Sequence, residues 1–167
     1  IVGVSDHGGW AILVTVSAAG DLLDRRRVEL VDADLPKIPH HVEAQGLPLD
    51  AAVALVERVR ASAERHARLR LDELAAAVAA PIIGIALREC PALPPTVAER
   101  ITNYTARNVA DWVMYRQALA GAAETRGWAV HWYAAKKLDD KPFAGVIGPP
   151  WNKDHRVAMA AAIAARK

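Results

Sequence analysis

Three short apolar runs, rich in β-branched residues and separated by glycine-containing turns, occupy the first 32 residues of the chain. Runs of this kind predict β-strands, and connections this short predict antiparallel hairpins between neighbours. The predicted strands cover residues 1–5, 10–17 and 22–32, with turns at 6–9 and 18–21. A sheet that starts with these three strands has two faces, so later segments of the chain have to pack on it and cover them.

The remainder of the sequence alternates between helical and strand-like patterns. Helical periodicity, capping residues and apolar runs mark the boundaries of each segment. The predicted order is a helix over 50–80, a buried strand over 81–87, a helix from the Thr96–Glu99 capping box to Gly127, a strand over 128–134, and a helix from Asn152 to Ala165. The pattern β-β-β-α-β-α-β-α is typical of an α/β protein, and we expect one domain over residues 1–167.

Composition narrows the class of protein further. The chain has 167 residues, with 21 Lys and Arg against 19 Asp and Glu, so its net charge of +2 gives no general attraction to nucleic acid or membrane. A single cysteine, Cys90, excludes an intramolecular disulfide framework. The longest uncharged apolar stretch, residues 74–87, is too short to span a bilayer and contains Pro81. We therefore expect a soluble, cytoplasmic protein with no membrane partner.

The order of elements resembles the ribonuclease H-like fold, and residue patterns in three places resemble RuvC-type Holliday-junction resolvases. These patterns are IVGVSDHGG at 1–9, PIIGIAL at 81–87 and DHRVAMAAAIA at 154–164. The resemblance implies a five-stranded mixed sheet in the order 3-2-1-4-5, with helices on both faces. It also implies nucleic acid as a partner and a divalent metal, Mg or Mn, as a cofactor, because such nucleases hold two metal ions with clustered carboxylates.

Two of the carboxylate positions implied by the resemblance lie on strands. On the first strand the acid position falls on Ser5, and Asp6 follows it. Side chains alternate along a strand, so Ser5 and Asp6 point to opposite faces unless the strand bulges or ends there. On the fourth strand the position falls on Ala86, and Glu89 lies three residues further on. Asp6 and Glu89 are therefore candidate site residues that are displaced from the family positions.

The last helix carries the best match. Asp154 occupies its first acid position, whereas Val157 occupies the second, and His155 is a candidate phosphate ligand or proton donor. An Asp in a first helical turn also has a structural explanation, because it favours the helix dipole. The candidate catalytic set is Asp6, Glu89, Asp154 and His155, with Asp6 and Asp154 as the candidate metal ligands.

Basic residues supply the candidate nucleic-acid contacts. Arg25 and Arg27 share one face of the predicted third strand, and Lys153 lies at the start of the last helix. Charges on an edge strand also prevent unwanted sheet pairing, which is the alternative explanation for the two arginines. His40 and His41 lie in a long loop over 33–48, where a metal site with Asp6 or Asp34 is the alternative to a plain loop.

Two functions fit these patterns. The first is a nucleic-acid-associated protein, with metal-dependent cleavage of phosphodiester bonds through a degenerate acidic site. The alternative is a catalytically inactive ribonuclease H-like domain that binds a protein partner or a second copy of itself through the third strand or the 33–48 loop. Carboxylates that converge in space would favour the first function, and a sheet edge without acids would favour the second.

Overall fold

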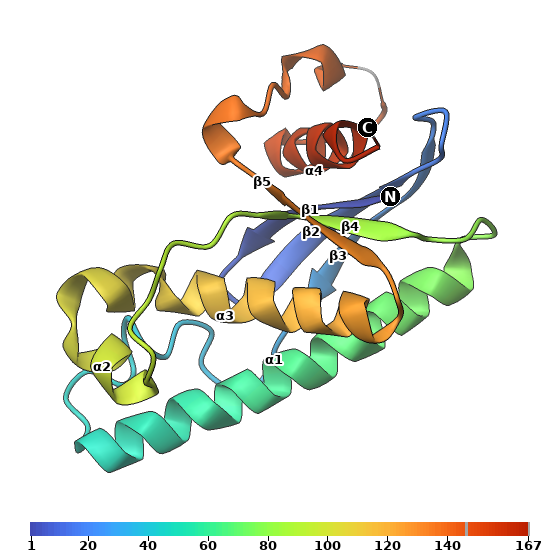
Figure 1. The fold of residues 1–167 in the computed structure, drawn as a ribbon. Helices are drawn as coiled ribbons and strands as arrows, with labels where there is room; N and C mark the ends of the chain where they lie inside the picture. Colours follow the sequence, from blue (N-terminus) through green and yellow to red (C-terminus); the bar gives the residue numbers. More distant parts are fainter. Residues whose placement is uncertain (146, 167) are drawn as a thin grey trace.

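A computed structural model describes residues 1–145 and 147–166, and it contains one five-stranded sheet in the order β3-β2-β1-β4-β5 (Figure 1). The predicted strand order is therefore confirmed. The elements are β1 (Val2–His7), β2 (Trp10–Val16), β3 (Leu22–Glu29), α1 (Leu49–Ala77), β4 (Gly84–Arg88), α2 (Val97–Thr102), α3 (Tyr104–Thr125), β5 (Ala129–Tyr133), the short 3₁₀ helices η1 (Ala135–Lys137) and η2 (Lys141–Phe143), and α4 (Lys153–Ala164).

The sheet is mixed. β1, β2 and β3 pair antiparallel, as the short turns predict, whereas β4 pairs parallel with β1 and β5 pairs parallel with β4. Parallel strands need helical crossovers, and here α1 precedes β4 and α2 with α3 precede β5. The C-terminal ends of β1, β4 and β5 therefore lie at one edge of the sheet, which we call the carboxyl edge.

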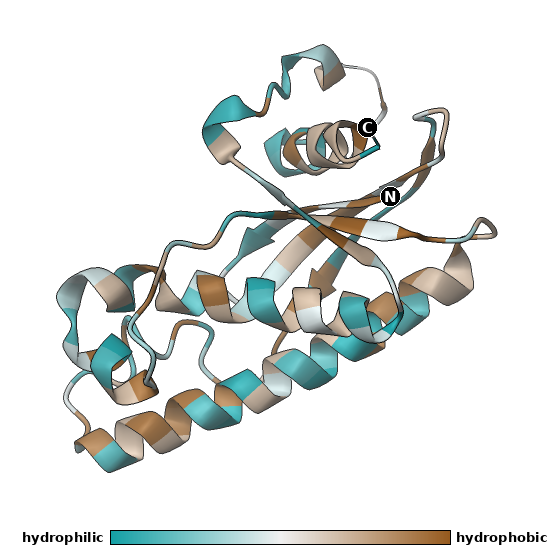
Figure 2. Cartoon of the chain, in the orientation of Figure 1, coloured by the Kyte–Doolittle hydropathy of each residue, from teal (hydrophilic) through white to brown (hydrophobic). Residues whose placement is uncertain are grey.

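Helices cover both faces of the sheet, as predicted. α1 and α3 pack on one face and α4 packs on the other (Figure 1), and Figure 2 shows apolar residues concentrated in the central strands between these layers. One core lies on the α1 and α3 side and a smaller one lies under α4. Along β1 the even-numbered side chains face α1 and α3, and the odd-numbered ones face α4, because side chains alternate along a strand.

Gly3 allows α4 to approach β1 closely. A Cβ atom at this position would lie 1.9 Å from the carbonyl oxygen of Ala158 and 2.6 Å from the backbone nitrogen of Ala162. Both are backbone atoms, so no side-chain rotation would relieve the overlap. The small residues of α4 and the absence of a side chain at Gly3 together set the distance between helix and sheet.

The 29-residue helix α1 is the longest element. One stripe of its residues is buried against the sheet and α3. Its exposed positions carry charged residues together with alanines and two leucines, so hydrophilic and hydrophobic colours alternate along the helix in Figure 2. At its centre Ser62 donates to a carboxylate oxygen of Asp32 at 2.8 Å, and His66 Nε2 lies 2.9 Å from the other oxygen.

In the part of the chain that the structure describes, no helix is both long enough and apolar enough to cross a bilayer.

Several predicted boundaries are wrong. The strand predicted over 22–32 ends at Glu29, and the strand predicted over 81–87 begins at Gly84. The strand predicted over 1–5 continues to His7, which pairs with Trp10 across a two-residue turn that contains Gly9 at a φ of 79°. The helix predicted from Thr96 to Gly127 is two helices, because Asn103 adopts an extended conformation. The side chain of Asn103 accepts a hydrogen bond from Ala106 N and so starts α3 as its N-cap.

Candidate functional site

Asp6 lies near the end of β1 and points toward α3, where it forms a buried ion pair. Its Oδ2 accepts from Arg116 Nε at 2.8 Å, and the two side chains are only 2% and 7% exposed. Arg116 Nη1 also donates to the carbonyl oxygen of Glu89 at 3.2 Å. Burial raises the pKa of Asp6, and the Arg116 guanidinium partly opposes this rise. The pair therefore links β1, α3 and the end of β4.

Asp154 lies on the other face of the sheet, in the first turn of α4. Its Oδ1 accepts from Ser5 Oγ at 3.2 Å and lies 2.9 Å from His7 Nε2. The His7 ring in turn stacks on Trp10, with centroids 3.9 Å apart. Ser5 and Asp154, the positions at which the resemblance implies acids on the first strand and the last helix, are thus in contact. Only one of them is a carboxylate.

These donors do not fit a two-metal magnesium centre. Mg²⁺ in nucleases is held by several carboxylate oxygens, and here Asp154 is the one carboxylate beside Ser5 and His7. Asp6 is on the opposite face with Arg116, and Glu89 follows the end of β4, so the structure does not bring Asp6, Glu89 and Asp154 together. Within residues 1–145 and 147–166, no three His, Cys, Asp or Glu residues form a group that could hold a metal ion.

Glu89 instead lines a cavity of about 700 Å³ at the carboxyl edge, which we call the edge cavity. β4, α3 and the segment that follows β5 form its walls. The lining residues are Arg88, Glu89, Cys90, Pro91, Asn108, Val109, Trp112, Arg116, Ala134, Ala135, Lys136 and Lys137. A crevice at the carboxyl ends of parallel strands is a common position for ligands in α/β proteins.

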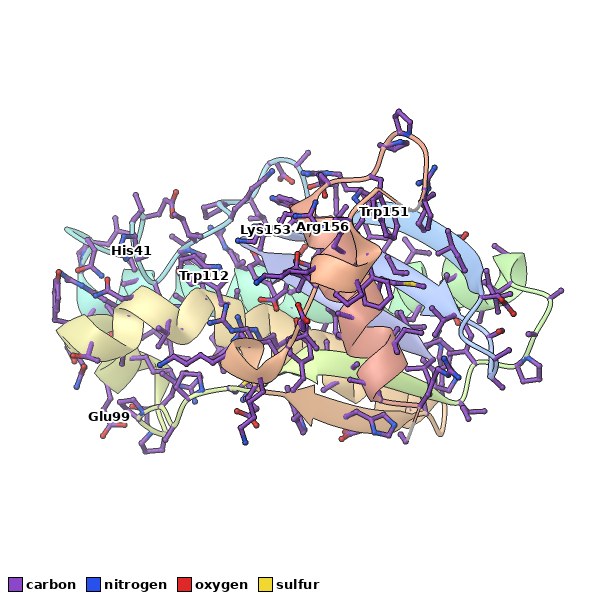
Figure 3. The ribbon with its side chains drawn as sticks, turned by 90° about the horizontal axis from the view of Figure 1, so that it is seen from above. His41, Glu99, Trp112, Trp151, Lys153 and Arg156 are labelled. Atoms are coloured by element: carbon purple, nitrogen blue, oxygen red, sulfur yellow. The ribbon has the colours of Figure 1, made fainter. Side chains whose placement is uncertain are left out.

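The edge cavity is positively charged. Arg88, Lys136 and Lys137 are exposed, and within the described chain none of them lies within ion-pair distance of a carboxylate. Glu89 is the one acidic residue among the lining residues. Trp112 contributes an indole to the wall (Figure 3). Free cations beside an aromatic surface are the elements of a nucleic-acid contact, because phosphates bind the charges and bases stack on the ring.

The start of α4 adds a second set of polar groups near the same edge. Asn152 caps the helix by accepting from the backbone nitrogens of Asp154 and His155, which confirms the predicted cap. The His155 ring bonds back to Asn152 at 2.8 Å, and burial lowers the pKa of His155. Lys153 is exposed at the start of α4 (Figure 3). The geometry therefore gives His155 a capping role, and it leaves Lys153 accessible.

The two β3 arginines already have partners in the protein. Arg25 donates to the carbonyl oxygens of Gly148 and Pro149, and its guanidinium lies 5.9 Å from the centre of the Trp151 ring. Arg27 stacks 3.7 Å over Trp10 and pairs with Glu29. β3 is an edge strand, as predicted. Arg25 thus supports the segment before α4, whereas Arg27 extends the aromatic stack that begins at His7.

Among the residues that line the edge cavity, only Glu89 was a candidate site residue from the sequence. Lys136 and Lys137 follow the last strand, where parallel strands end, and that position was an available signal. Arg116 lies four residues after Trp112, so the two side chains share one face of α3. An arginine beside a tryptophan on the same helix face indicates that the arginine has a buried acidic partner. Nothing in the local sequence identifies that partner as Asp6, which is 110 residues away.

The sheet order and the helices on both faces define the ribonuclease H-like fold, which confirms the resemblance found in the sequence. The solved structures that match include the Thermus thermophilus RuvC in complex with a Holliday junction substrate. It has a TM-score of 0.52 and 14% sequence identity, and the match covers 97% of this chain and 88% of that chain. A second Thermus thermophilus RuvC structure has a TM-score of 0.46 and 14% identity over 97% and 90% of the two chains. No family model matches the chain, and no curated protein matches it.

Proposed function

We propose that this chain is a nucleic-acid-binding domain that holds phosphates at the carboxyl edge of its sheet and does not cleave them by two-metal catalysis. The observation that carries the proposal is the edge cavity, with three cations that lack carboxylate partners in the described chain and an indole in its wall. The RuvC structure in complex with a Holliday junction shows that this fold type binds branched DNA in another protein. At 14% sequence identity, the similarity to that protein concerns the fold alone.

The positive charges in the edge cavity suit the phosphate backbone of a nucleic acid better than a protein partner. Protein interfaces are depleted of lysine at their centres, whereas phosphate contacts are made by lysine and arginine. Lys153 at the start of α4 extends the basic surface, because the Asp140–Arg156 ion pair of 3.1 Å ties the segment after β5 to α4. Nucleic acid is therefore favoured over the alternative of a protein-interaction module.

Replacing Lys136 and Lys137 by glutamine is expected to weaken binding of a branched or single-stranded DNA by roughly tenfold at about 0.1 M salt. The slope of log affinity against log salt should fall by about two, because roughly one counterion is released per phosphate contact. Fluorescence anisotropy over a salt series measures both quantities. The matched control is Arg58→Gln with Arg68→Gln, two exposed cations on α1, which should change neither quantity by much. An equal effect of both pairs would show that only net charge matters, which would contradict the proposed site.

Manganese is expected to leave the melting temperature unchanged, and branched or single-stranded DNA should remain intact. A metal ion at a hundredfold excess over its Kd would stabilise a folded protein by about 2.7 kcal/mol. Cleavage roles for Asp6, Glu89, Asp154 and His155 remain predictions from the sequence, and this experiment tests them. A manganese-dependent rise in Tm that disappears in Asp154→Asn but persists in the exposed control Asp34→Asn, together with cleavage, would establish the nuclease instead.

A further inference from the structure

His40 and Asp111 form a buried pair on the side of the molecule away from the start of α4. The Asp111 carboxylate is fully buried, and it accepts from the backbone nitrogens of His40 and His41 at 3.0 and 3.1 Å. Its Oδ1 also lies 2.7 Å from His40 Nδ1. Because a carboxylate only accepts, Nδ1 carries the proton of this bond. The ring of His40 is thus fixed with Nε2 pointing away from Asp111.

His40 Nε2 is buried and has no hydrogen-bond partner among the residues that the structure describes. The side chain is 2% exposed and lines a cavity of about 100 Å³ between α1, α2 and α3, which we call the helix cavity. A buried polar atom without a partner costs free energy, so such an atom on a residue that lines a cavity favours a polar occupant there, either water or an ion. The volume exceeds what one water molecule needs, and it is far too small for a nucleotide.

The other polar groups in the helix cavity favour an anion. Arg60 and Arg100 both line it, and Glu64 is the one carboxylate in the lining. Arg60 lies 3.8 Å from Glu64 and also pairs with Glu57, so Arg100 is the guanidinium without a carboxylate partner among the described residues. Arg100 donates from Nε and Nη2 to the carbonyl oxygens of Pro94 and Pro95, which fixes its guanidinium in place. Two guanidinium groups repel a divalent cation, and one carboxylate is too few to hold it.

We infer that the helix cavity binds a tetrahedral oxyanion of the size of phosphate. Such an ion accepts from both arginines, and hydrogen phosphate satisfies His40 Nε2 in either ring state. It donates a hydrogen bond to a neutral ring, or it accepts one from a protonated ring. The ion is either free phosphate or a terminal phosphate of a larger molecule. This site is separate from the edge cavity, because the two cavities share no lining residue.

The test is a titration of the isotope-labelled chain with inorganic phosphate, followed by the His40 imidazole signals in NMR and by calorimetry. We expect a Kd on the order of 1 mM or tighter. His40→Asn should raise this Kd at least tenfold, because asparagine keeps a donor near the Nδ1 position and removes Nε2. Arg60→Gln should raise the Kd several-fold, and this residue is exposed enough to be replaced without loss of the fold. His41→Asn is the control, since this exposed side chain is not part of the cavity lining.

Three results would overturn the inference: no shift of the His40 signals at about 10 mM phosphate, the same Kd in His40→Asn, or a response to Zn²⁺ in place of phosphate. Competition by a 5′-phosphorylated oligonucleotide, and not by its unphosphorylated form, would identify a terminal phosphate as the source. Competition by neither would identify the free ion. Lys136→Gln with Lys137→Gln should leave the phosphate Kd within twofold, so this inference and the proposed function can fail separately.

Discussion

Replacing Arg116 by methionine is expected to lower the free energy of unfolding by about 3–5 kcal/mol at pH 7. The variant leaves the carboxylate of Asp6 buried, with 2% of its side chain exposed, and removes its only ion-pair partner within the described residues. Burying an uncompensated charge costs far more than losing a surface salt bridge. Urea unfolding followed by circular dichroism measures the change. Arg126→Met is the control, because its partner Asp72 is largely exposed, and we expect a loss of about 1 kcal/mol or less.

The pH dependence of the Arg116→Met variant provides an independent check. Burial already raises the pKa of Asp6, and removing the guanidinium that opposes this effect raises the pKa further. The folded state then binds a proton more tightly than the unfolded chain, so stability is lost as the pH rises through the raised pKa. The loss in free energy of unfolding caused by Arg116→Met should therefore be largest at pH 7 and should shrink as the pH falls toward about 4. A loss of stability that is the same at every pH would contradict its attribution to the buried charge of Asp6.

A double replacement separates charge burial from packing. Asp6→Leu combined with Arg116→Met removes both charges, and replacing a whole buried ion pair by apolar groups is often neutral. We expect the double variant to recover most of the stability that Arg116→Met loses. The double-mutant cycle then gives the coupling energy of the pair.

Gly3→Ala is expected to destabilise the protein by about 3 kcal/mol or more, at the upper end of the usual cost of overpacking. The new methyl group would lie 1.9 Å from the backbone oxygen of Ala158, so α4 has to move away from β1. Gly121→Ala is the matched control, because Gly121 lies inside α3 and nothing lies within 4 Å of a Cβ there. The control should stabilise the helix by about 0.5–1 kcal/mol. Opposite signs for one chemical change would confirm the close approach of α4, and similar losses in both variants would contradict it.

Local patterns were sufficient to predict most of the fold. The strand segments, the long helix and the Thr96–Glu99 capping box depend on alternation, periodicity and neighbouring residues, whereas the strand order followed from the resemblance to the ribonuclease H-like fold. The strand order, the long helix and the capping box are confirmed. The boundary between α2 and α3 depends on a single residue, Asn103. Asn103 suits a helix interior poorly and a cap well, and in the structure its side chain caps α3.

The candidate site was harder to predict, because its residues meet across long stretches of chain. Alternation correctly suggested that Ser5 and Asp6 point to opposite faces, and the structure shows Ser5 with Asp154 and Asp6 with Arg116. No local rule pairs Asp6 with Arg116, and none places Lys136 and Lys137 in the wall of a cavity with Trp112. Such contacts arise only when the whole sheet is assembled.

The packing of α4 on β1 and β2 also has a consequence for how the protein is made. α4 begins about 150 residues after β1, so the sheet face that α4 covers cannot be covered until those late residues leave the ribosome. Until then the apolar side chains of Ile12, Val14 and Val16 face solvent. Contacts between such distant segments slow folding, and exposed apolar strands promote aggregation. Truncation before Asn152 would therefore leave this apolar face of the sheet without the helix that covers it.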